Sequence, residues 1–462
     1  MSFLDKMKRG HSRAMLVGGA FAILAAVLMP EDSLAGDLKN PPLPTPAPRI
    51  EAKIAAIEPM RLAPLRALTQ TEMEYARVAW RYFENNTNEK TLLVNAAHKY
   101  PSTTMWDTAS YLVGLISAHK LAIIDDAEFH RRIDGALRSL QKLELFDGRL
   151  PNKAYNVRTL KMSTYSNKPD KRGLGWSALD LAHFLVPIAY LIRNHPDHVP
   201  AIEKVLERWD TQALVKDGRL IGSAVRKSKT PGKGKAKGKA DKGKTIFVQE
   251  GRVGYEQYGA GAMMLFGLDA AAAAQFHTFA TFKTVGDVDI PVDTRDLGNG
   301  AASFATSEPY VLTGLDLGFN STSLRLASTV YRAQEQRYRD TGQFTAVSEG
   351  HISIKPYFTY STVWGGGEPW AVMRLDGSRM DDLRTISTKA AFGWHALFET
   401  EYTTKLIASL EDLAQPEKGW MEGRYELDGS PNKSTTCNNN AIILASLAYR
   451  QFGPLMQHDK GT

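Results

Sequence analysis

Long helix-forming runs separated by long loops constrain the fold of this chain more than any other feature. Apolar residues recur at helical spacing, and several runs begin at a Ser, Thr or Asp that can cap a helix. At least nine helices are expected. Their ranges are 71–83, 107–121, 125–140, 177–190, 199–214, 258–279, 321–339, 387–413 and 438–451.

The loops between these runs do not alternate strands with helices. Two stretches, 282–296 and 351–370, gather Val, Ile, Tyr and Thr among Gly and Pro, as short strands do. The pattern predicts an all-α fold, an (α/α)6 toroid of helical hairpins with minor β-hairpin elements and with its loops gathered at two rims.

The N-terminal residues have the pattern of a secretory signal. Four basic residues precede a 14-residue apolar run, 16–29, and Ser33 and Ala35 offer small side chains for cleavage. We expect a signal peptide at 1–35, a proline-rich tether at 36–67 and a single domain at 68–462. The body is therefore expected in the periplasm or outside the cell; an uncleaved membrane anchor is the alternative.

The positive charge of the chain is concentrated in one segment, 226–244. It holds one Arg and eight Lys against one Asp, more than the net charge of +7 for the whole chain. We expect a disordered insertion that tolerates change or contacts an anionic envelope surface. Because it lacks aromatic residues, and the rest of the chain is not basic, nucleic acid is not an expected partner.

Acidic residues beside aromatic, glycine or proline residues recur in the turns between the helical runs. A ring can stack on a sugar while a carboxyl group handles its oxygens, and glycoside hydrolysis needs two carboxyl groups. The acids in such turns are Asp107, Glu256, Glu308, Glu349 and Glu422.

Three of these acids also have a purely structural interpretation. Glu256 can be an ordinary acid at a helix N-terminus, Glu308 can begin a helix with Pro309 after it, and Asp107 can be an N-cap. Asp180 is interpreted as structural. We take Glu256 and Glu308 as the acid and base in either order, with Asp107, Glu349 and Glu422 as alternatives.

Several aromatic residues near these acids are candidate sugar platforms. No helical His-Glu spacing typical of a metal site appears, and neither a phosphate loop nor a nucleophile elbow is found, so no cofactor is expected. The lone Cys437 cannot form an internal disulfide. The candidate platforms are Trp106, Tyr255, Tyr258, Tyr310, Trp176 and Trp420.

Seven motifs together resemble a bacterial family known only as domain of unknown function 3131, which is grouped with glucoamylase-like proteins. The motifs begin at Thr104, Leu150, Gly175, Gly254, Ser307, Ser387 and Gly423. The resemblance covers residues 70–452 and implies the (α/α)6 fold and action on glucans, in some branches β-1,2-glucans, by acid and base carboxylates. One departure is Gly350, which follows Glu349 where an acid is usual.

Two functions from different classes remain open on the sequence. The first is an exported glycoside hydrolase or transglycosylase acting on a glucan or envelope polysaccharide without a metal. The second is a non-catalytic protein that binds polysaccharide during its synthesis or export.

Overall fold

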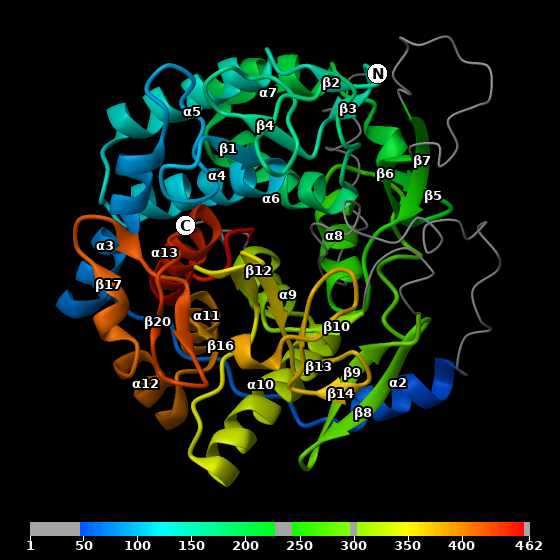
Figure 1. The fold of residues 1–462 in the computed structure, drawn as a ribbon, viewed down its shortest axis with the longest axis vertical. Coiled ribbons are helices and arrows are strands. Elements are labelled where there is room, and N and C mark those ends of the chain that lie inside the picture. Colours follow the sequence, from blue (N-terminus) through cyan, green and yellow to red (C-terminus); the bar gives the residue numbers. More distant parts are fainter. Residues whose placement is uncertain (1–46, 227–242, 296–302, 457–462) are drawn as a thin grey trace.

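Six helices form a closed ring in the computed structural model, which describes residues 47–226, 243–295 and 303–456 (Figure 1). Each helix contacts the next, and the last returns to the first. The inner helices are α4 (Met105–Lys120), α6 (Ala178–Asn194), α8 (Tyr255–Met264), α9 (Glu308–Leu312) with its π-helical continuation η4 (Thr313–Leu317), α11 (Thr388–Phe398) and α13 (Cys437–Phe452).

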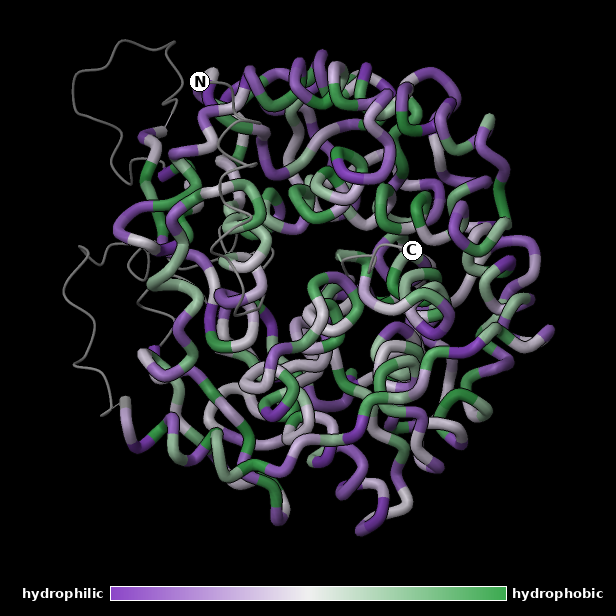
Figure 2. The backbone as a smooth tube through the Cα atoms, turned by 180° about the vertical axis from the view of Figure 1, so that it is seen from behind, coloured by the Kyte–Doolittle hydropathy of each residue, from purple (hydrophilic) through white to green (hydrophobic). Residues whose placement is uncertain are grey.

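The inner helices are apolar around most of their circumference, which explains their position. In α4 every residue from Met105 to Ala118 is buried. A helix that is hydrophobic all round must be covered on every side. Figure 2 shows hydrophilic residues interspersed with hydrophobic ones along the outermost turns of the ring.

Outer helices cover the ring. They are α3 (Gln70–Asn86), α5 (Asp126–Leu140), α7 (Val199–Leu206), α10 (Ser321–Thr341) and α12 (Glu401–Ala408). Along the chain α3 precedes the first inner helix, and each of the others lies between two inner helices. Between α8 and α9 this place is taken by the hairpin of β8 (Ala280–Val285) and β9 (Val288–Asp293), whose second strand packs on α10.

Two helix starts differ from the expectation. The N-cap of α3 is Thr69, not Thr71, and Glu72 completes a capping box with it. The N-cap of α4 is Thr104, and Asp107 is the third helical residue. Asp107 is therefore the partner of a cap rather than the cap itself, because its carboxylate accepts from the Thr104 backbone.

Three helices are shorter than expected. The expected run 387–413 is two helices, α11 and α12, because Glu399 adopts a left-handed φ of 43° and ends the first. The expected run 258–279 ends at Met264, and 199–214 ends at Leu206 before a 3-10 turn, η2 (Thr211–Leu214). In each case the apolar periodicity of the sequence continues past the last helical residue, so the pattern does not indicate where the helix ends.

The second half of the expected tether, 36–67, is folded, and this corrects the domain boundary. Helix α2 (Ala47–Ala56) packs on α10 and buries Ile50 and Ile54. Beyond it the Met60 backbone N–H donates to Ser328 Oγ at 2.8 Å. Residues 47–67 therefore belong to the domain, and 1–46 lie outside the described residues.

The loops carry many short antiparallel strands, arranged in small sheets of two or three strands. Strands are thus more widespread than the few hairpins expected. The remaining strands are β1 (Ser102–Thr104), β2 (Leu145–Phe146), β3 (Leu150–Pro151), β4 (Ala154–Asn156), β5 (Val215–Lys216), β6 (Arg219–Arg226), β7 (Lys244–Gln249), β10 (Phe304–Ala305), β11 (Glu349–His351), β12 (Phe358–Ser361), β13 (Trp364–Gly365), β14 (Glu368–Pro369), β15 (Val372–Met373), β16 (Thr385–Ser387), β17 (Ala414–Gln415), β18 (Gly419–Trp420), β19 (Gly423–Tyr425) and β20 (Pro431–Asn432).

The expected lysine-rich insertion falls between two paired strands. β6 and β7 pair antiparallel up to Arg226 and Lys244. Residues 227–242, which carry most of its charge, lie outside the described residues. None of the helices described is long and apolar enough to span a bilayer.

Candidate active site

The polar residues of the site come from the first turns of the inner helices. Helix N-termini carry a partial positive charge that favours carboxylates. These residues are Asp107 of α4, Asp180 of α6, Glu256 of α8, Glu308 of α9, Lys389 of α11 and Asn438 of α13. The contacts of Glu308 with Lys389 and Asn438 show that α9, α11 and α13 begin at the same end of the ring.

A buried lysine organises the largest group, which we call the Lys389 cluster: Lys389, Glu308, Glu349, Glu422 and Asp107. The Lys389 ammonium forms an ion pair with Glu308 Oε2, and the two side chains are 3% and 2% exposed. Burial lowers the pKa of Lys389, but the charges of Glu308, Glu422 and Glu349 outweigh it and raise the pKa overall. The lysine therefore stays charged in the core.

Glu349 and Glu422 are two further buried carboxyl groups of this cluster. Burial raises the pKa of each to about 7, although the charge of Lys389 opposes the shift. Glu349 Oε2 accepts from Ser348 Oγ at 3.0 Å, and Glu422 accepts from Thr436 Oγ1. Both can therefore exchange a proton near neutral pH.

Gly350 explains how Glu422 approaches the strand that carries Glu349. A Cβ atom at position 350 would lie 3.0 Å from Glu422 Oε2. The glycine that departs from the family pattern therefore leaves room for a second carboxyl group beside Glu349.

Asp107 is held by the start of its helix. Its Oδ2 accepts from the Thr104 backbone N–H at 3.0 Å and from Thr104 Oγ1 at 2.7 Å. Burial raises the pKa of Asp107, with smaller opposing contributions from those hydrogen bonds.

Asp180 forms a second group with Glu250 and Lys153. Burial, and then the charge of Glu250, raise the pKa of Asp180 to about 8. Its Oδ1 is buried and has no hydrogen-bond partner among the described residues. Glu250 accepts from Ser177 Oγ at 2.9 Å and lies 3.7 Å from Lys153 Nζ. Asp180 is thus a carboxyl group that keeps its proton at neutral pH.

The pKa values of Tyr360 and Tyr165 are raised by acids of these groups. The pKa of Tyr360 is raised by burial and then by the charges of Glu349, Glu308 and Asp180. The pKa of Tyr165 is raised by burial and then by Asp180, Glu250 and Tyr360. As a whole residue Tyr165 is half-buried, with its hydroxyl on the buried side near the acids.

Glu256 belongs to a separate ion-pair group. Its Oε2 lies 2.6 Å from Arg295, and its Oε1 accepts from Gln249 at 3.0 Å. The same guanidinium binds Asp293 at 2.6 Å. The structure therefore joins Glu308 with Glu349, Glu422 and Asp107, and it does not place Glu256 in that group.

The six candidate platforms are all buried, which corrects the expectation that they stack on sugar. Trp176 and Trp420 are fully buried, and their indole N–H groups donate to the backbone carbonyls of Ile221 and Tyr75. Trp106 stacks on a histidine of α6, and Tyr255, Tyr258 and Tyr310 are at most 6% exposed. A platform needs a free ring face, so these residues pack the core instead.

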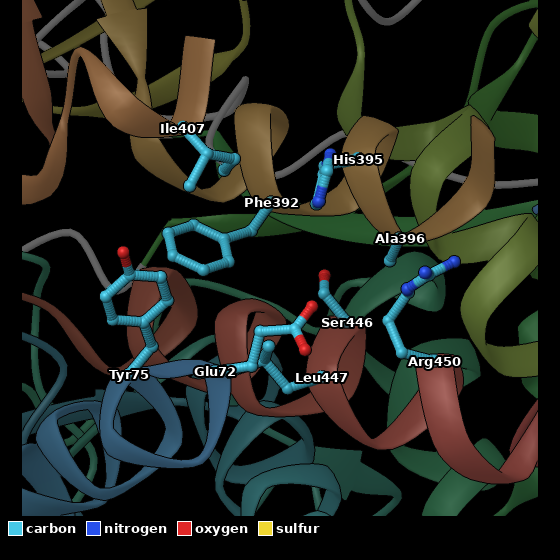
Figure 3. Close-up of a pocket in the computed structure, with 9 residues that line it drawn as sticks. All are labelled: Glu72, Tyr75, Phe392, His395, Ala396, Ile407, Ser446, Leu447 and Arg450. Atoms are coloured by element: carbon cyan, nitrogen blue, oxygen red, sulfur yellow. The ribbon is translucent and has the colours of Figure 1, made fainter. Parts of the chain in front are cut away.

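A small cavity of about 60 Å³ lies at the other end of α11 and α13, away from the Lys389 cluster (Figure 3). Its polar residues include Glu72, which pairs with Arg66, and Arg450, which pairs with Glu399. In the part of the chain that the structure describes, no three His, Cys, Asp or Glu residues are placed to hold a metal ion.

Comparison with known proteins places the chain in a family. A family model described as "protein of unknown function (DUF3131)" matches residues 74–453. The chain belongs to this family. A search of curated proteins finds no match.

Solved structures of similar fold are glucoamylase-like proteins and β-1,2-glucanases. The chain is similar to an endo-β-1,2-glucanase from Chitinophaga pinensis solved with sophorotriose and glucose, at 9% identity and a TM-score of 0.56, covering 84% of this chain and 94% of that one. A glucoamylase-like protein from Bacteroides fragilis matches at 11% identity and 0.55, covering 84% and 93%. An endo-β-1,2-glucanase from Talaromyces funiculosus solved with sophorose matches at 10% and 0.53, covering 82% and 85%. These likenesses establish the fold.

Sequence reasoning missed Lys389 and Asn438 and treated Asp180 as structural. The available signal was positional: each is a polar residue in the first turn of a strongly apolar helix. Glu250 had no such signal, because it lies in a loop.

Proposed function

We propose that this chain is a glycoside hydrolase or transglycosylase that acts on a β-glucan, with the (α/α)6 architecture as its frame. The observation that carries the proposal is the gathering of Glu308, Glu349, Glu422 and Asp107 around Lys389, with Asp180 close by. Glycoside hydrolysis requires one protonated and one ionised carboxyl group on either side of the scissile bond.

Asp180 is the proposed general acid. A general acid must hold its proton at the working pH, and the pKa of Asp180 is raised to about 8 by burial and Glu250. Its buried Oδ1 makes no hydrogen bond in the described structure, so the protonated carboxyl group has an unused bonding position for a glycosidic oxygen.

Glu349 is the proposed base or nucleophile. The charges of both Glu349 and Asp180 raise the pKa of Tyr360, so both carboxyl groups lie near that tyrosine. The charge of Lys389 favours its ionised form. Glu256 and Glu308 are less suited, because each is already in an ion pair, with Arg295 and Lys389 respectively.

Turnover by purified protein tests the proposal. We would incubate it with β-1,2-glucan, β-1,3-glucan, β-1,4-glucan and α-glucans and analyse the products by chromatography. Asp180→Asn and Glu349→Gln should each lower turnover by at least about 100-fold, with retained affinity for the glycan. The exposed Glu401→Gln is the control. Binding without turnover on every glucan would favour the non-catalytic polysaccharide-binding alternative.

Export remains a proposal supported by the N-terminal sequence. Fusing residues 1–67 to a reporter active only outside the cytoplasm tests it, with the four basic residues before position 16 replaced as the control. Absence of reporter activity from the intact fusion would contradict export.

A further inference from the structure

A continuous line of polar side chains crosses the centre of the ring and ends on Glu308. It joins Glu308 of α9 to Asp316 of η4 through one residue each from α13, α4, α6 and α8. Asn438 Nδ2 donates to Glu308 Oε1 at 2.8 Å. Ser110 Oγ lies 3.1 Å from Asn438 Oδ1 and 3.3 Å from His183 Nε2. The other ring nitrogen of His183, Nδ1, lies 2.7 Å from the Tyr258 hydroxyl, and that hydroxyl lies 2.5 Å from Asp316 Oδ2.

Asp316, at the far end of this line, is set in an unusual backbone. It lies in the π-helical turn η4, and such turns are frequent at functional positions. The residue is 1% exposed, and its Oδ1 has no hydrogen-bond partner in the described part of the chain. A carboxylate with one bare oxygen in the core is costly, whereas a neutral acid is tolerated.

The hydrogen bonds along this line can run in either of two directions, depending on whether Asp316 carries a proton. With Asp316 protonated, its O–H donates to Tyr258, Tyr258 donates to His183 Nδ1, and His183 Nε2–H donates to Ser110. Ser110 is then free to donate to Asn438 Oδ1. Along the line Tyr258, His183 and Ser110 each donate once and accept once, and the Asn438 amide that binds Glu308 accepts a hydrogen bond on its oxygen.

With Asp316 ionised, the hydrogen bonds between Asp316 and Ser110 reverse their direction. Tyr258 donates to Asp316, His183 donates from Nδ1 to Tyr258, and the single Ser110 proton goes to His183 Nε2. Asn438 Oδ1 then loses its donor. The amide that fixes Glu308 is less constrained in this state.

We propose that Asp316 is a positioning residue whose proton sets the direction of this line and thereby how firmly Asn438 holds Glu308. The consequence for catalysis rests on the function proposed above, whereas the coupling between Asp316 and Asn438 does not. His183 relays the direction by changing its tautomer without gaining a charge, because burial lowers its pKa to about 3.

The surroundings of Asp316 place its transition near neutral pH. Burial raises the pKa of Asp316 to about 7, and the hydrogen bond with Tyr258 opposes the shift. His183 Nδ1 lies 3.9 Å from Asp316 Oδ2. The ionisable groups on the other helices packed against η4 are engaged elsewhere: Lys389 with Glu308, His395 with Thr403, Arg450 with Glu399 and Glu256 with Arg295.

Nitrogen NMR of the histidine rings tests the coupling without any substrate. In protein labelled with ¹⁵N-histidine, the His183 signals are identified by their loss in His183→Gln. Between pH 5.5 and 8.5 the wild type should pass from the Nε2–H to the Nδ1–H tautomer, with a midpoint near 7. Asp316→Asn should show one tautomer throughout. A wild-type His183 that keeps one tautomer over this range overturns the proposal, whether or not Asp316→Asn folds.

The pH profile of turnover tests the consequence of this coupling for catalysis. Ionisation of Asp316 should lower wild-type kcat by about fivefold across neutral pH, the effect of one lost hydrogen bond. Asp316→Asn should lack that step while KM is unchanged. If no glucan is cleaved, the proposed function fails and the tautomer result still decides the coupling. If glucan is cleaved and both proteins show the same pH profile, the positioning role fails.

Discussion

Removing the ammonium group of Lys389 is the sharpest test of how the candidate site is built. Lys389 and Glu308 form a buried ion pair with side-chain exposures of 3% and 2%. Replacing one partner of such a pair leaves an uncompensated charge and costs about 3–5 kcal/mol. Glu349 and Glu422 also lose a compensating charge. We therefore expect Lys389→Met to lose at least about 3 kcal/mol of unfolding free energy at pH 8.

Chemical denaturation at two pH values provides the measurement. A lone buried carboxyl group is more stable when neutral, so the loss in Lys389→Met should be smaller at pH 5 than at pH 8. The double variant Lys389→Met/Glu308→Gln should recover part of the stability, because it also removes the orphaned charge. Lys405→Met, which breaks an exposed pair with Glu401, is the control and should leave stability nearly unchanged.

Two outcomes would refute this reasoning. One is a loss below about 1 kcal/mol in Lys389→Met, which is the range of an exposed pair. The other is a loss that does not depend on pH, since the argument requires carboxyl groups that become neutral on acidification.

Three further predictions concern single side chains. The pKa of Glu422 in the folded protein is about 7, against an ordinary value of 4.5, so the native state binds this proton more tightly than the unfolded state does. The bound proton therefore contributes fully to the free energy of unfolding below pH 4.5, and this contribution declines between pH 4.5 and pH 7. Glu422→Gln should remove a decline of about 3 kcal/mol over that interval, seen by denaturation as a flatter pH profile. Gly350→Ala places a methyl group against Glu422 Oε2 and should reduce turnover. The free energy of unfolding should change by less than about 1 kcal/mol. Unchanged turnover would show that the Glu422 side chain has room to move. Thr104→Ala should cost about 1–2 kcal/mol in denaturation by removing the cap of α4, and Thr104→Ser should restore it; equal losses in both variants would contradict the capping role.

The helical character of the chain could be predicted because it depends on neighbouring residues. The starts at Ser177 and Asp125 were correct, since a cap and its helix are local in sequence. The end of α11 was missed, because a glutamate with a left-handed backbone gave no glycine signal. The folding of α2 was also missed, because the segment that includes Ile50 is stabilised by contacts with the distant α10.

The candidate acids were found by their local setting, but their partners were not. Glu308 and Glu256 have similar settings, each in the first turn of a helix beside aromatic residues. Glu308 meets Lys389, 81 positions further on, whereas Glu256 meets Arg295, 39 positions further on. The spacing along the sequence does not predict which basic residue pairs with each of the two glutamates.

The sequence by itself therefore determined a ring-forming set of apolar helices and the acids that begin them, because both follow from contacts within a few residues. Tertiary structure alone decided which carboxyl groups share one lysine, which are neutralised by arginine and which aromatic rings are covered. The physical reason is that the pKa of a group and the exposure of a ring depend on the charges and atoms that long-range packing brings around them.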